Sequence, residues 1–205
     1  PSTLQQSIVH VGILLVQAVI NSFGSTALAG YSAGMRIESL SIVPMLAMGN
    51  AMSTFTAQNM GAGNIDRVKK GYQMCYVIVL TAGAVLCIMY QLAGGMFVSL
   101  FLDSGSSEAY NIGLSYVRFL SFFYSFIGLK ATTDGLLRGA GDVAAFTAAN
   151  LVNLSIRVIV TNVFAPVYGI QVAWMAVPLG WAANYVISFG WYLTGKWKNV
   201  RVIRK

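Results

Sequence analysis

Charged residues are scarce in this sequence of 205 residues, and so are the residues that usually build metal sites and disulfides. Asp, Glu, Lys and Arg make up 9% of the chain, against about 25% in soluble domains, which need a polar shell. There is one histidine, and the two cysteines, Cys75 and Cys87, both lie in an apolar run. This composition excludes a zinc site of ordinary spacing and favours free, packed thiols over a disulfide. We therefore expect no metal site.

Long apolar runs fill most of the sequence. Apolar residues make up 57% of the chain, and a helix needs roughly 20 largely apolar residues to cross the hydrocarbon core of a bilayer. Because bilayers admit only helices or closed barrels, and because these runs are long and unbroken, we predict helices. The sequence thus predicts an all-α integral membrane protein, with a six-helix transmembrane lobe over residues 1–195 and a basic tail over 196–205. The six expected helices span residues 4–23, 26–57, 67–102, 108–138, 143–164 and 170–193.

Glycine and capping residues separate several of these runs. The segments 61–64 and 139–142 each contain two glycines and end in Asn64 or Asp142. Glycine readily adopts the left-handed conformation that ends a helix, and an Asn or Asp side chain can accept a hydrogen bond from the next helix. We therefore expect tight turns here, with helix N-caps at Asn64 and Asp142.

The net charge of +7 does not indicate a nucleic-acid ligand, because most basic residues lie in short segments between apolar runs. If six helices alternate in direction, the basic residues of the second connection, the fourth connection and the tail fall on one side. Cytoplasmic segments are rich in Lys and Arg. We predict that both termini are cytoplasmic, in a plasma membrane such as the bacterial inner membrane. The basic residues concerned are Arg67, Lys69, Lys70, Arg138, Lys196, Lys198, Arg201, Arg204 and Lys205.

The first expected helix carries a narrow polar stripe. Gln6, His10, Gln17 and Asn21 fall on one face at about 100° per residue. Two interpretations stay open: the stripe lines a hydrated cavity, or its amides bond to a packed neighbouring helix. His10, with a reference pKa of about 6.5, is a candidate proton carrier, although a lone histidine is more often simply hydrogen bonded.

Two charged residues lie in the second expected helix. Arg36 and Glu38 point about 200° apart, so they cannot pair as helix neighbours, and Arg36 shares its face with Asn50. Glu38 is the only carboxylate away from the cytoplasmic ends and the outer loop. Its role stays open between an ion pair with an arginine of another helix, proton or cation coupling, and interfacial exposure. Pro44 lacks an N–H and is predicted to kink this helix, as is Pro178 in the sixth.

A charged ridge lies near the cytoplasmic end of the fourth expected helix. Lys130, Asp134 and Arg138 recur every four residues, and Asp134 before Arg138 is the favourable order for an ion pair. We expect this ridge to act as a cytoplasmic lock between helices. A substrate or ion role is the alternative.

The fifth expected helix has a polar stripe with Arg157 at its deep end. Arg157 lies roughly 22 Å from Asp142 along the helix at about 1.5 Å per residue, which is deep in the bilayer. A cation there needs a partner, and Glu38 lies in the same outer half, so we hypothesise a Glu38–Arg157 pair. Together the stripes predict a substrate or ion cavity lined by Gln6, His10, Gln17, Asn21, Arg36, Glu38, Asn50, Asn150, Asn153 and Arg157.

Several short strings occur in a characteristic order along the chain. The most specific string is Ser53–Asn64, followed by Arg67. The others are Pro1–Gln5, Gly24–Tyr31, Arg36-Ile37-Glu38 with Pro44, and Asp134–Asp142. In this order, and over nearly its whole length, the chain resembles the second half of the multidrug and toxic compound extrusion (MATE) family. The chain also begins at Pro1 without an initiator Met or a signal-peptide pattern, so we expect a piece of a longer protein.

The resemblance implies the C-terminal lobe of a twelve-helix antiporter, with the N-terminal six-helix lobe absent from this chain. Such a protein exports lipophilic, often cationic small molecules (multidrug efflux) in exchange for Na⁺ or H⁺ by alternating access, with lipid and the other lobe as partners and no cofactor besides the coupling ion. The NorM-type branch places a carboxylate in the first helix of this lobe and an aspartate midway along the fourth. Here Val9, His10 and the stretch 122–129 contain no acid. The cation site of that branch is therefore not transferred to this chain, and the coupling ion stays open.

Three other functions would each need a different arrangement of these residues. A lipid-linked oligosaccharide flippase of the same superfamily would prefer a larger basic cavity, for which Arg36, Arg118 and Arg157 are available. A non-transporting membrane scaffold would not need polar stripes that converge on one interior. An intramembrane enzyme needs a nucleophile and a base, or a metal, in register. One histidine and no paired intramembrane acids do not supply them, so we predict that the chain is not an enzyme.

Overall fold

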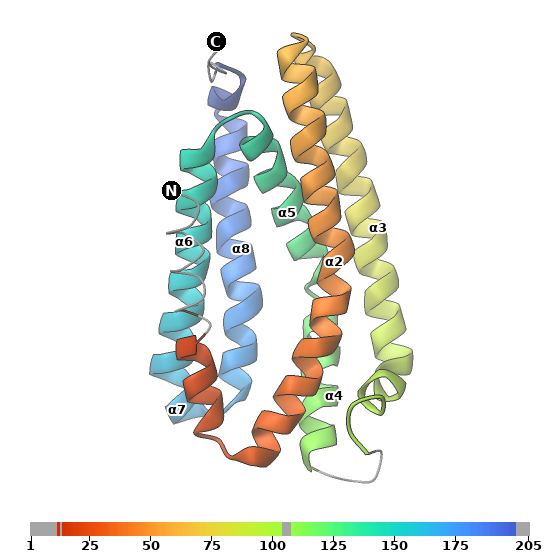
Figure 1. The fold of residues 1–205 in the computed structure, drawn as a ribbon, viewed down its shortest axis with the longest axis vertical. Helices are drawn as coiled ribbons and strands as arrows, with labels where there is room; N and C mark the ends of the chain where they lie inside the picture. The colour runs from red at the N-terminus through yellow and green to blue at the C-terminus, as the bar shows by residue number, and fades with distance from the viewer. Residues whose placement is uncertain (1–11, 13, 104–107, 200–205) are drawn as a thin grey trace.

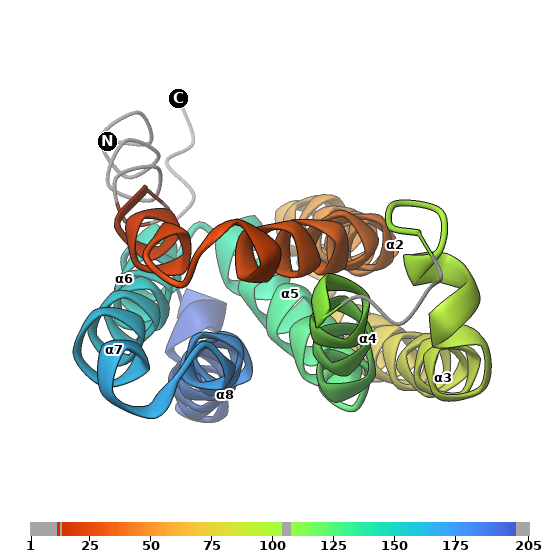
Figure 2. The ribbon, with the colours of Figure 1, turned by 90° about the horizontal axis from the view of Figure 1, so that it is seen from below.

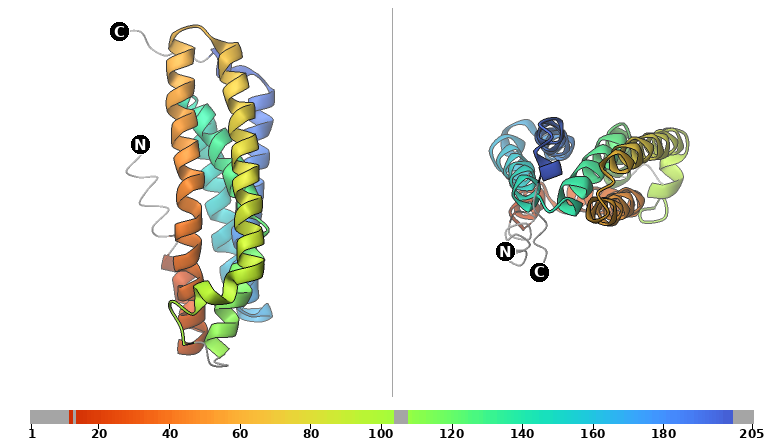
Figure 3. Two further views of the ribbon diagram at one scale, coloured as in Figure 1. Left: turned by 90° about the vertical axis from the view of Figure 1, so that its right-hand side faces the viewer. Right: turned by 90° about the horizontal axis from the view of Figure 1, so that it is seen from above.

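The computed structural model describes residue 12 and residues 14–103 and 108–199, which form helices and short turns without any strand. The long helices run along the long axis of one elongated bundle (Figures 1 and 3). The first helix is described over residues 14–21, and Gln6 and His10 lie outside the described residues. The elements that follow are α2 (Ser25–Gly61), α3 (Ile65–Val98), α4 (Glu108–Ser121), α5 (Tyr124–Gly139), α6 (Val143–Ile159), the π-helical turn η1 (Val160–Phe164), α7 (Ala165–Tyr168), α8 (Gln171–Leu193) and the 3-10 turn η2 (Lys196–Asn199).

Four helical segments in the described part of the chain are long and apolar enough to cross a membrane: α2, α3, the segment from α6 through α7, and α8. The pair α4 and α5 qualifies as a fifth span, but it is bent by 53°. The expected continuous helix over residues 108–138 is therefore wrong at Phe122 and Phe123, where the helix breaks. The first expected span, 4–23, is described only in part, so the total of six spans stays a prediction.

The two prolines do not break their helices. Pro44 lies inside α2 and Pro178 inside α8, and both helices continue through them. Transmembrane helices tolerate proline because neighbouring groups can satisfy the backbone groups that it frees. A bend of 53° lies between α4 and α5, at a site without proline. The predicted kinks at Pro44 and Pro178 stay predictions.

The outward face of α3 is apolar. Val77, Val85, Ile88 and Leu92 are all more than half exposed, and Leu92 reaches 81%. A surface of this kind is unfavourable in water and matches the hydrocarbon of a bilayer. α3 therefore has a lipid-facing side, as an integral membrane protein requires.

The glycine turns at one end of the bundle form as predicted. Gly63 and Gly141 have φ values of 74° and 85°, a left-handed conformation that glycine adopts without strain. The residue after each glycine donates its backbone N–H to a carbonyl five residues back, at 2.8 and 2.9 Å. Asp142 caps α6 by accepting from the Ala145 N–H at 3.3 Å. Asn64 is the N-cap residue of α3, as predicted, but its side chain makes no capping hydrogen bond.

α5 lies between two groups of helices. One group contains α2, α3 and α4, and the other contains the first helix, α6, α7 and α8 (Figure 2). α5 packs against α2 and α3 on one side and against α8 on the other. Its approach to α2 is close, since a Cβ atom on Gly135 would lie 2.1 Å from the Gly49 carbonyl oxygen. Small residues allow such close packing of helix backbones in membranes.

The basic connections lie at one end of the bundle. The α2–α3 turn, the α5–α6 turn and η2 are at the upper end in Figure 1, whereas the turn before α2 and the α7–α8 turn are at the lower end. We call these the inner and the outer end, after the predicted topology. The arrangement is the one that the predicted cytoplasmic placement of Lys and Arg requires.

Candidate functional site

A cavity of about 160 Å³ lies between the first helix, α2 and α6. Its wall combines a carboxylate, a guanidinium, a phenol and an amide with apolar side chains, and polar walls of this kind favour the presence of water. Among the predicted cavity residues, Gln17, Glu38 and Arg157 lie on it. The complete wall contains Gly12, Val16, Gln17, Tyr31, Met35, Glu38, Ser39, Ile42, Leu154 and Arg157.

Glu38 is the acid of this cavity, and a phenol supports it. The hydroxyl of Tyr116 on α4 donates a hydrogen bond to Glu38 Oε2. The Tyr116 ring is held edge-on by Tyr31 and by Trp174, with centroid distances of 5.3 and 5.7 Å. Because Tyr116 is packed on both sides, its hydroxyl stays aimed at the carboxylate. Glu38 is thus a buried acid, 8% exposed, with one fixed donor and one side on a cavity.

Arg157 lies on the same cavity, close enough to act on Glu38 electrostatically. The hypothesised direct ion pair is not formed: the ion pairs within 4.0 Å in the described part of the chain are Lys69–Asp66 and Lys130–Asp134. The charges instead belong to two walls of one cavity, and Tyr116 supplies the donor to the carboxylate. Three residues after Arg157, α6 widens into the π-helical turn η1. Turns of this type are frequent at functional sites.

Two amides that were predicted to line a cavity make other contacts. The Gln17 amide donates to Asn21 Oδ1 at 3.3 Å, and Asn21 itself is exposed at the end of the first helix. Asn153 faces α8, where a Cβ atom on Gly180 would lie 2.2 Å from its Oδ1. Because Gly180 has no side chain, α6 and α8 approach each other closely, and α8 covers Asn153. The Oδ1 atom of Asn153 is buried without a hydrogen-bond partner. Neither Asn21 nor Asn153 lines the cavity.

Arg36 and Asn50 lie on an exposed face of α2. The Arg36 guanidinium lies over the ring of Phe101, 5.8 Å from its centroid, and Asn50 accepts a hydrogen bond from Arg138. Ser39 and Thr54 are exposed on the same helix. Polar side chains at membrane depth seldom face lipid. Leu40 and Val43 are exposed on the same face, which therefore carries polar and apolar side chains together.

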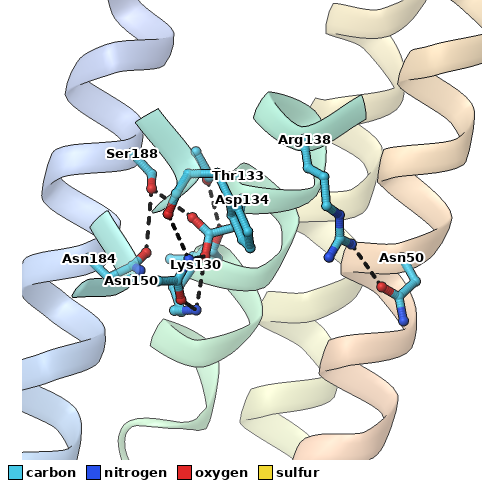
Figure 4. A network of polar contacts seen from close by, with 10 residues as sticks. Asn50, Lys130, Thr133, Asp134, Arg138, Asn150, Asn184 and Ser188 are labelled. Carbon is cyan, nitrogen blue, oxygen red and sulfur yellow. Dashed lines mark hydrogen bonds and ion pairs between the residues drawn. The ribbon is translucent and has the colours of Figure 1, made fainter. Parts of the chain in front are cut away.

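A second polar cluster joins α5, α6 and α8 nearer the inner end (Figure 4). Lys130 Nζ lies 2.9 Å from Asp134 Oδ2 and donates to Asn150 Oδ1 at 3.0 Å. Asn150 Nδ2 donates to Asp134 Oδ2 at 3.3 Å, and the Ser188 hydroxyl donates to Asp134 Oδ1 at 2.7 Å. Asn184, one turn from Ser188, is fully buried, and its Nδ2 has no partner. We call these five residues the inner cluster.

Arg138 does not belong to the inner cluster. It donates to Asn50 Oδ1 at 2.8 Å and to Ser53 Oγ at 3.4 Å, both on α2 (Figure 4). The predicted single ridge is therefore divided, and the ion pair with spacing i, i+4 forms between Lys130 and Asp134 rather than between Asp134 and Arg138. The physical reason is that α5 lies between two helix groups, so its neighbouring faces meet different partners.

Several polar residues of these clusters were not found from the sequence. Tyr116 lies among aromatic residues that lipid contact explains equally well, so no pattern distinguishes it. Asn184 and Ser188 are spaced i, i+4 in an apolar helix, which is a usable signal for a polar face. No group of three or more His, Cys, Asp or Glu in the described residues could hold a metal ion, and both cysteines are free thiols.

Known proteins share this sequence pattern. The sequence model of the family described as MatE matches residues 1–164. The chain is 26% identical over 203 residues to the probable multidrug resistance protein YpnP of Bacillus subtilis, covering 98% of this chain and 45% of that protein. It is 22% identical to the probable multidrug resistance protein NorM of Thermotoga maritima, covering 100% of this chain and 44% of that protein. The chain thus spans less than half the length of these curated relatives.

Solved structures share the fold. A MOP superfamily transporter from Pyrococcus furiosus matches with a TM-score of 0.85 at 18% identity, covering 94% of this chain and 42% of that one. An outward-facing multidrug resistance MATE family transporter matches with a TM-score of 0.85 at 17% identity, covering 97% of this chain and 44% of that one. The chain therefore belongs to the MatE family of membrane transporters, corresponds to one half of such a transporter, and is not an enzyme.

Proposed function

We propose that the chain is the C-terminal half of a secondary active antiporter that exports lipophilic or cationic small molecules in exchange for Na⁺ or H⁺. The relatives named as multidrug resistance proteins support this substrate class. The observation on which the proposal rests most is the cavity between the first helix, α2 and α6, with Glu38 and Arg157 in its wall.

Glu38 is the proposed coupling group of this half. A carboxylate binds either a proton or Na⁺ with little change in the surrounding fold, and an intramembrane acid is a functional candidate by default. Tyr116 donates to one carboxylate oxygen, and the Arg157 guanidinium lies on the same cavity wall. A cation that arrives at Glu38 would weaken the attraction to Arg157. Loading and unloading of Glu38 would thereby alter how α2 and α6 attract each other across the cavity.

The exposed polar face of α2 is the proposed boundary of the substrate cleft. Arg36, Ser39, Asn50 and Thr54 are exposed there although they lie in a membrane helix. The other half of the transporter, related to this one by pseudo-twofold symmetry, would cover this face and leave water and substrate between the halves. Rocking of the two halves would then open the cleft to either side in turn.

The inner contacts of α5 are proposed to act as the cytoplasmic lock. Lys130 and Asp134 join α5 to α6 and α8, whereas Arg138 joins α5 to α2. These contacts hold both helix groups of this half together at the inner end. We place that end, and both chain termini, in the cytoplasm of a bacterial cell.

A lipid-linked oligosaccharide flippase is the less favoured alternative. It would need a large basic cavity, yet of Arg36, Arg118 and Arg157 only Arg157 lines the described cavity. Arg36 is paired with the Phe101 ring, and Arg118 is exposed on α4. The basic groups are thus dispersed, which supports drug efflux over a flippase.

Efflux from vesicles that contain the purified full-length protein tests the proposal. A cationic fluorescent dye should leave the vesicles only while a Na⁺ or proton gradient is present, and an ionophore that collapses the gradient should stop it. Glu38→Gln should lower the gradient-driven rate at least about tenfold, whereas Glu108→Gln at the exposed start of α4 should not. Efflux that persists without any cation gradient would overturn the proposed mechanism.

A further inference from the structure

The helix that contains Tyr116 is broken and bent without a proline. α4 ends at Ser121, α5 begins at Tyr124, and the two are bent by 53°. The Phe123 N–H donates to the Leu120 carbonyl, three residues back, at 2.8 Å. This spacing is that of a 3-10 turn, which is tighter than an α-helix. Sharp kinks at positions without proline or glycine usually arise where a side chain or water enters the hydrogen-bond ladder. The bend therefore needs a partner outside its own backbone.

Gln91 of α3 is that partner. Its side-chain amide donates to the Arg118 carbonyl at 2.9 Å and to Ser121 Oγ at 2.9 Å. The Ser121 hydroxyl in turn donates to the same Arg118 carbonyl at 2.7 Å. In a continuous helix this carbonyl would accept the backbone N–H of Phe122, four residues on. Because a free carbonyl is costly in hydrocarbon, the two side-chain donors stabilise the bent form against the straight one.

The opposite side of the bend is loosely packed. An apolar cavity of about 270 Å³ lies between the bend and α8, and its wall includes Phe119, Phe123 and Phe126 on one side and Pro178 on the other. This pocket is open to the surface of the bundle, where Met175 and Leu179 are about half exposed. The bend is thus hydrogen bonded on its α3 side and has free volume on its α8 side. That combination permits the angle to change without a clash.

The bend also separates the two polar sites of this half. Tyr116, on α4, donates to Glu38 in the cavity. Lys130 and Asp134, on α5, hold the inner cluster. A change of angle at the bend moves the first group of contacts relative to the second. It would therefore transmit a change at the cavity to the inner end of the bundle.

We infer that Gln91 is the positioning residue of a hinge between α4 and α5, and that release of the Arg118 carbonyl by Gln91 allows this helix to straighten. The hinge itself is a property of the fold. Its use in transport rests on the proposed antiport function. Gln91 does not line the Glu38 cavity, so it acts on transport through the position of α4 and not by contact with the coupling ion.

Distance measurements between two spin labels test the hinge without any transport assay. The full-length protein, with Cys75, Cys87 and any other native cysteine replaced, would carry labels at Asn111→Cys on α4 and Gln171→Cys on α8, both exposed near the outer end. Asn111 lies about 15 Å from the bend, so complete straightening from 53° would move it by about 13 Å. Gln91→Met keeps the length of the side chain and removes the donor. Gln73→Met, at an exposed position of α3, is the matched control.

The hinge predicts a distance distribution in Gln91→Met that is shifted, or gains a second population, by about 4–13 Å. Gln73→Met should reproduce the parent distribution. Ser121→Ala, which keeps the Gln91–Arg118 bond, should give a smaller shift and serves as the test if Gln91→Met does not fold. Unshifted distances in the folded Gln91→Met protein, or in Ser121→Ala when only that variant folds, would overturn the inference.

The transport readout separates the hinge from the proposed function. If the parent protein performs gradient-driven efflux, Gln91→Met should lower its maximal rate at least about fivefold and change the apparent KM less than about twofold, because the substrate contacts are intact. An equal loss in a variant with unshifted distances would mean that Gln91 has another role, and the hinge would be wrong. If the parent protein shows no efflux, the proposed function fails while the distances still decide the hinge.

Discussion

Removal of one member of the Lys130–Asp134 pair should destabilise the protein far more than removal of both. The side chains are 14% and 6% exposed, and Lys130 Nζ lies 2.9 Å from Asp134 Oδ2. Breaking a buried ion pair from one side costs about 3–5 kcal/mol, because the remaining charge stays buried. Replacing both partners by apolar residues of similar size is often close to neutral.

The hydrogen-bond partners that remain around each charge determine where each single variant falls in the range of about 3–5 kcal/mol. In Lys130→Met the Asp134 carboxylate keeps two donors, Asn150 and Ser188, so we expect a loss of about 3 kcal/mol in the free energy of unfolding. Asp134→Leu leaves the Lys130 ammonium with the Asn150 oxygen alone, so we expect about 5 kcal/mol. The double variant should lie within about 2 kcal/mol of the parent protein.

Reversible denaturant titration of the full-length protein in mixed micelles would give the four free energies of this double-mutant cycle. The matched control is the Lys69–Asp66 pair, which has the same 2.9 Å separation but side chains that are 42% and 88% exposed. Its coupling energy should be below about 1 kcal/mol, against at least about 3 kcal/mol for Lys130 and Asp134. Single variants whose losses simply add in the double variant would refute the reasoning.

Three further predictions use the same titration. Tyr116→Phe removes the donor to Glu38 and should lower the free energy of unfolding by about 1–3 kcal/mol, and an effect no larger than that of Tyr168→Phe at an exposed site would contradict this role. Gly135→Ala places a Cβ atom 2.1 Å from the Gly49 carbonyl oxygen and should cost about 1–3 kcal/mol. Gly61→Ala, with nothing within 4 Å, should stay within about 0.5 kcal/mol of the parent, and equal effects would exclude close α2–α5 packing. Arg138→Ala removes exposed contacts only and should lower the free energy of unfolding by less than about 1 kcal/mol. A loss as large as that of Lys130→Met would mean that Arg138 acts with Lys130 and Asp134 as one charged ridge.

Membrane insertion and the turns were predictable because they depend on local composition. Apolar run length places α3 and α8 within a few residues of their observed bounds. Gly63 and Gly141 mark turns that need a left-handed residue, and both have one. These features follow from a window of sequence and a general rule, without any knowledge of which helices are neighbours.

The break at Phe122 and Phe123 could not be predicted in this way. Its cause is a hydrogen bond from Gln91, 27 residues before Arg118, and no local rule links an amide on one helix to a carbonyl on another. The division of the charged ridge has the same origin, because the partner of Lys130 depends on where α6 and α8 lie. Glu38 and Arg157 lie on the wall of one cavity, since polar stripes do indicate faces. That this cavity binds a substrate or an ion stays a prediction. Asn153 does not line that wall, because Gly180 allows α8 to cover its face.

We propose that the cavity between the first helix, α2 and α6 is hydrated and belongs to a transport route. Reaction of a single cysteine with a water-soluble maleimide in the full-length, otherwise cysteine-free protein tests it most directly. Gln17→Cys, in the cavity wall, should react at least about tenfold faster than Val77→Cys on the lipid-facing side of α3, and a transported substrate should slow it. A Gln17→Cys protein that reacts as slowly as Val77→Cys, with and without substrate, would contradict the account.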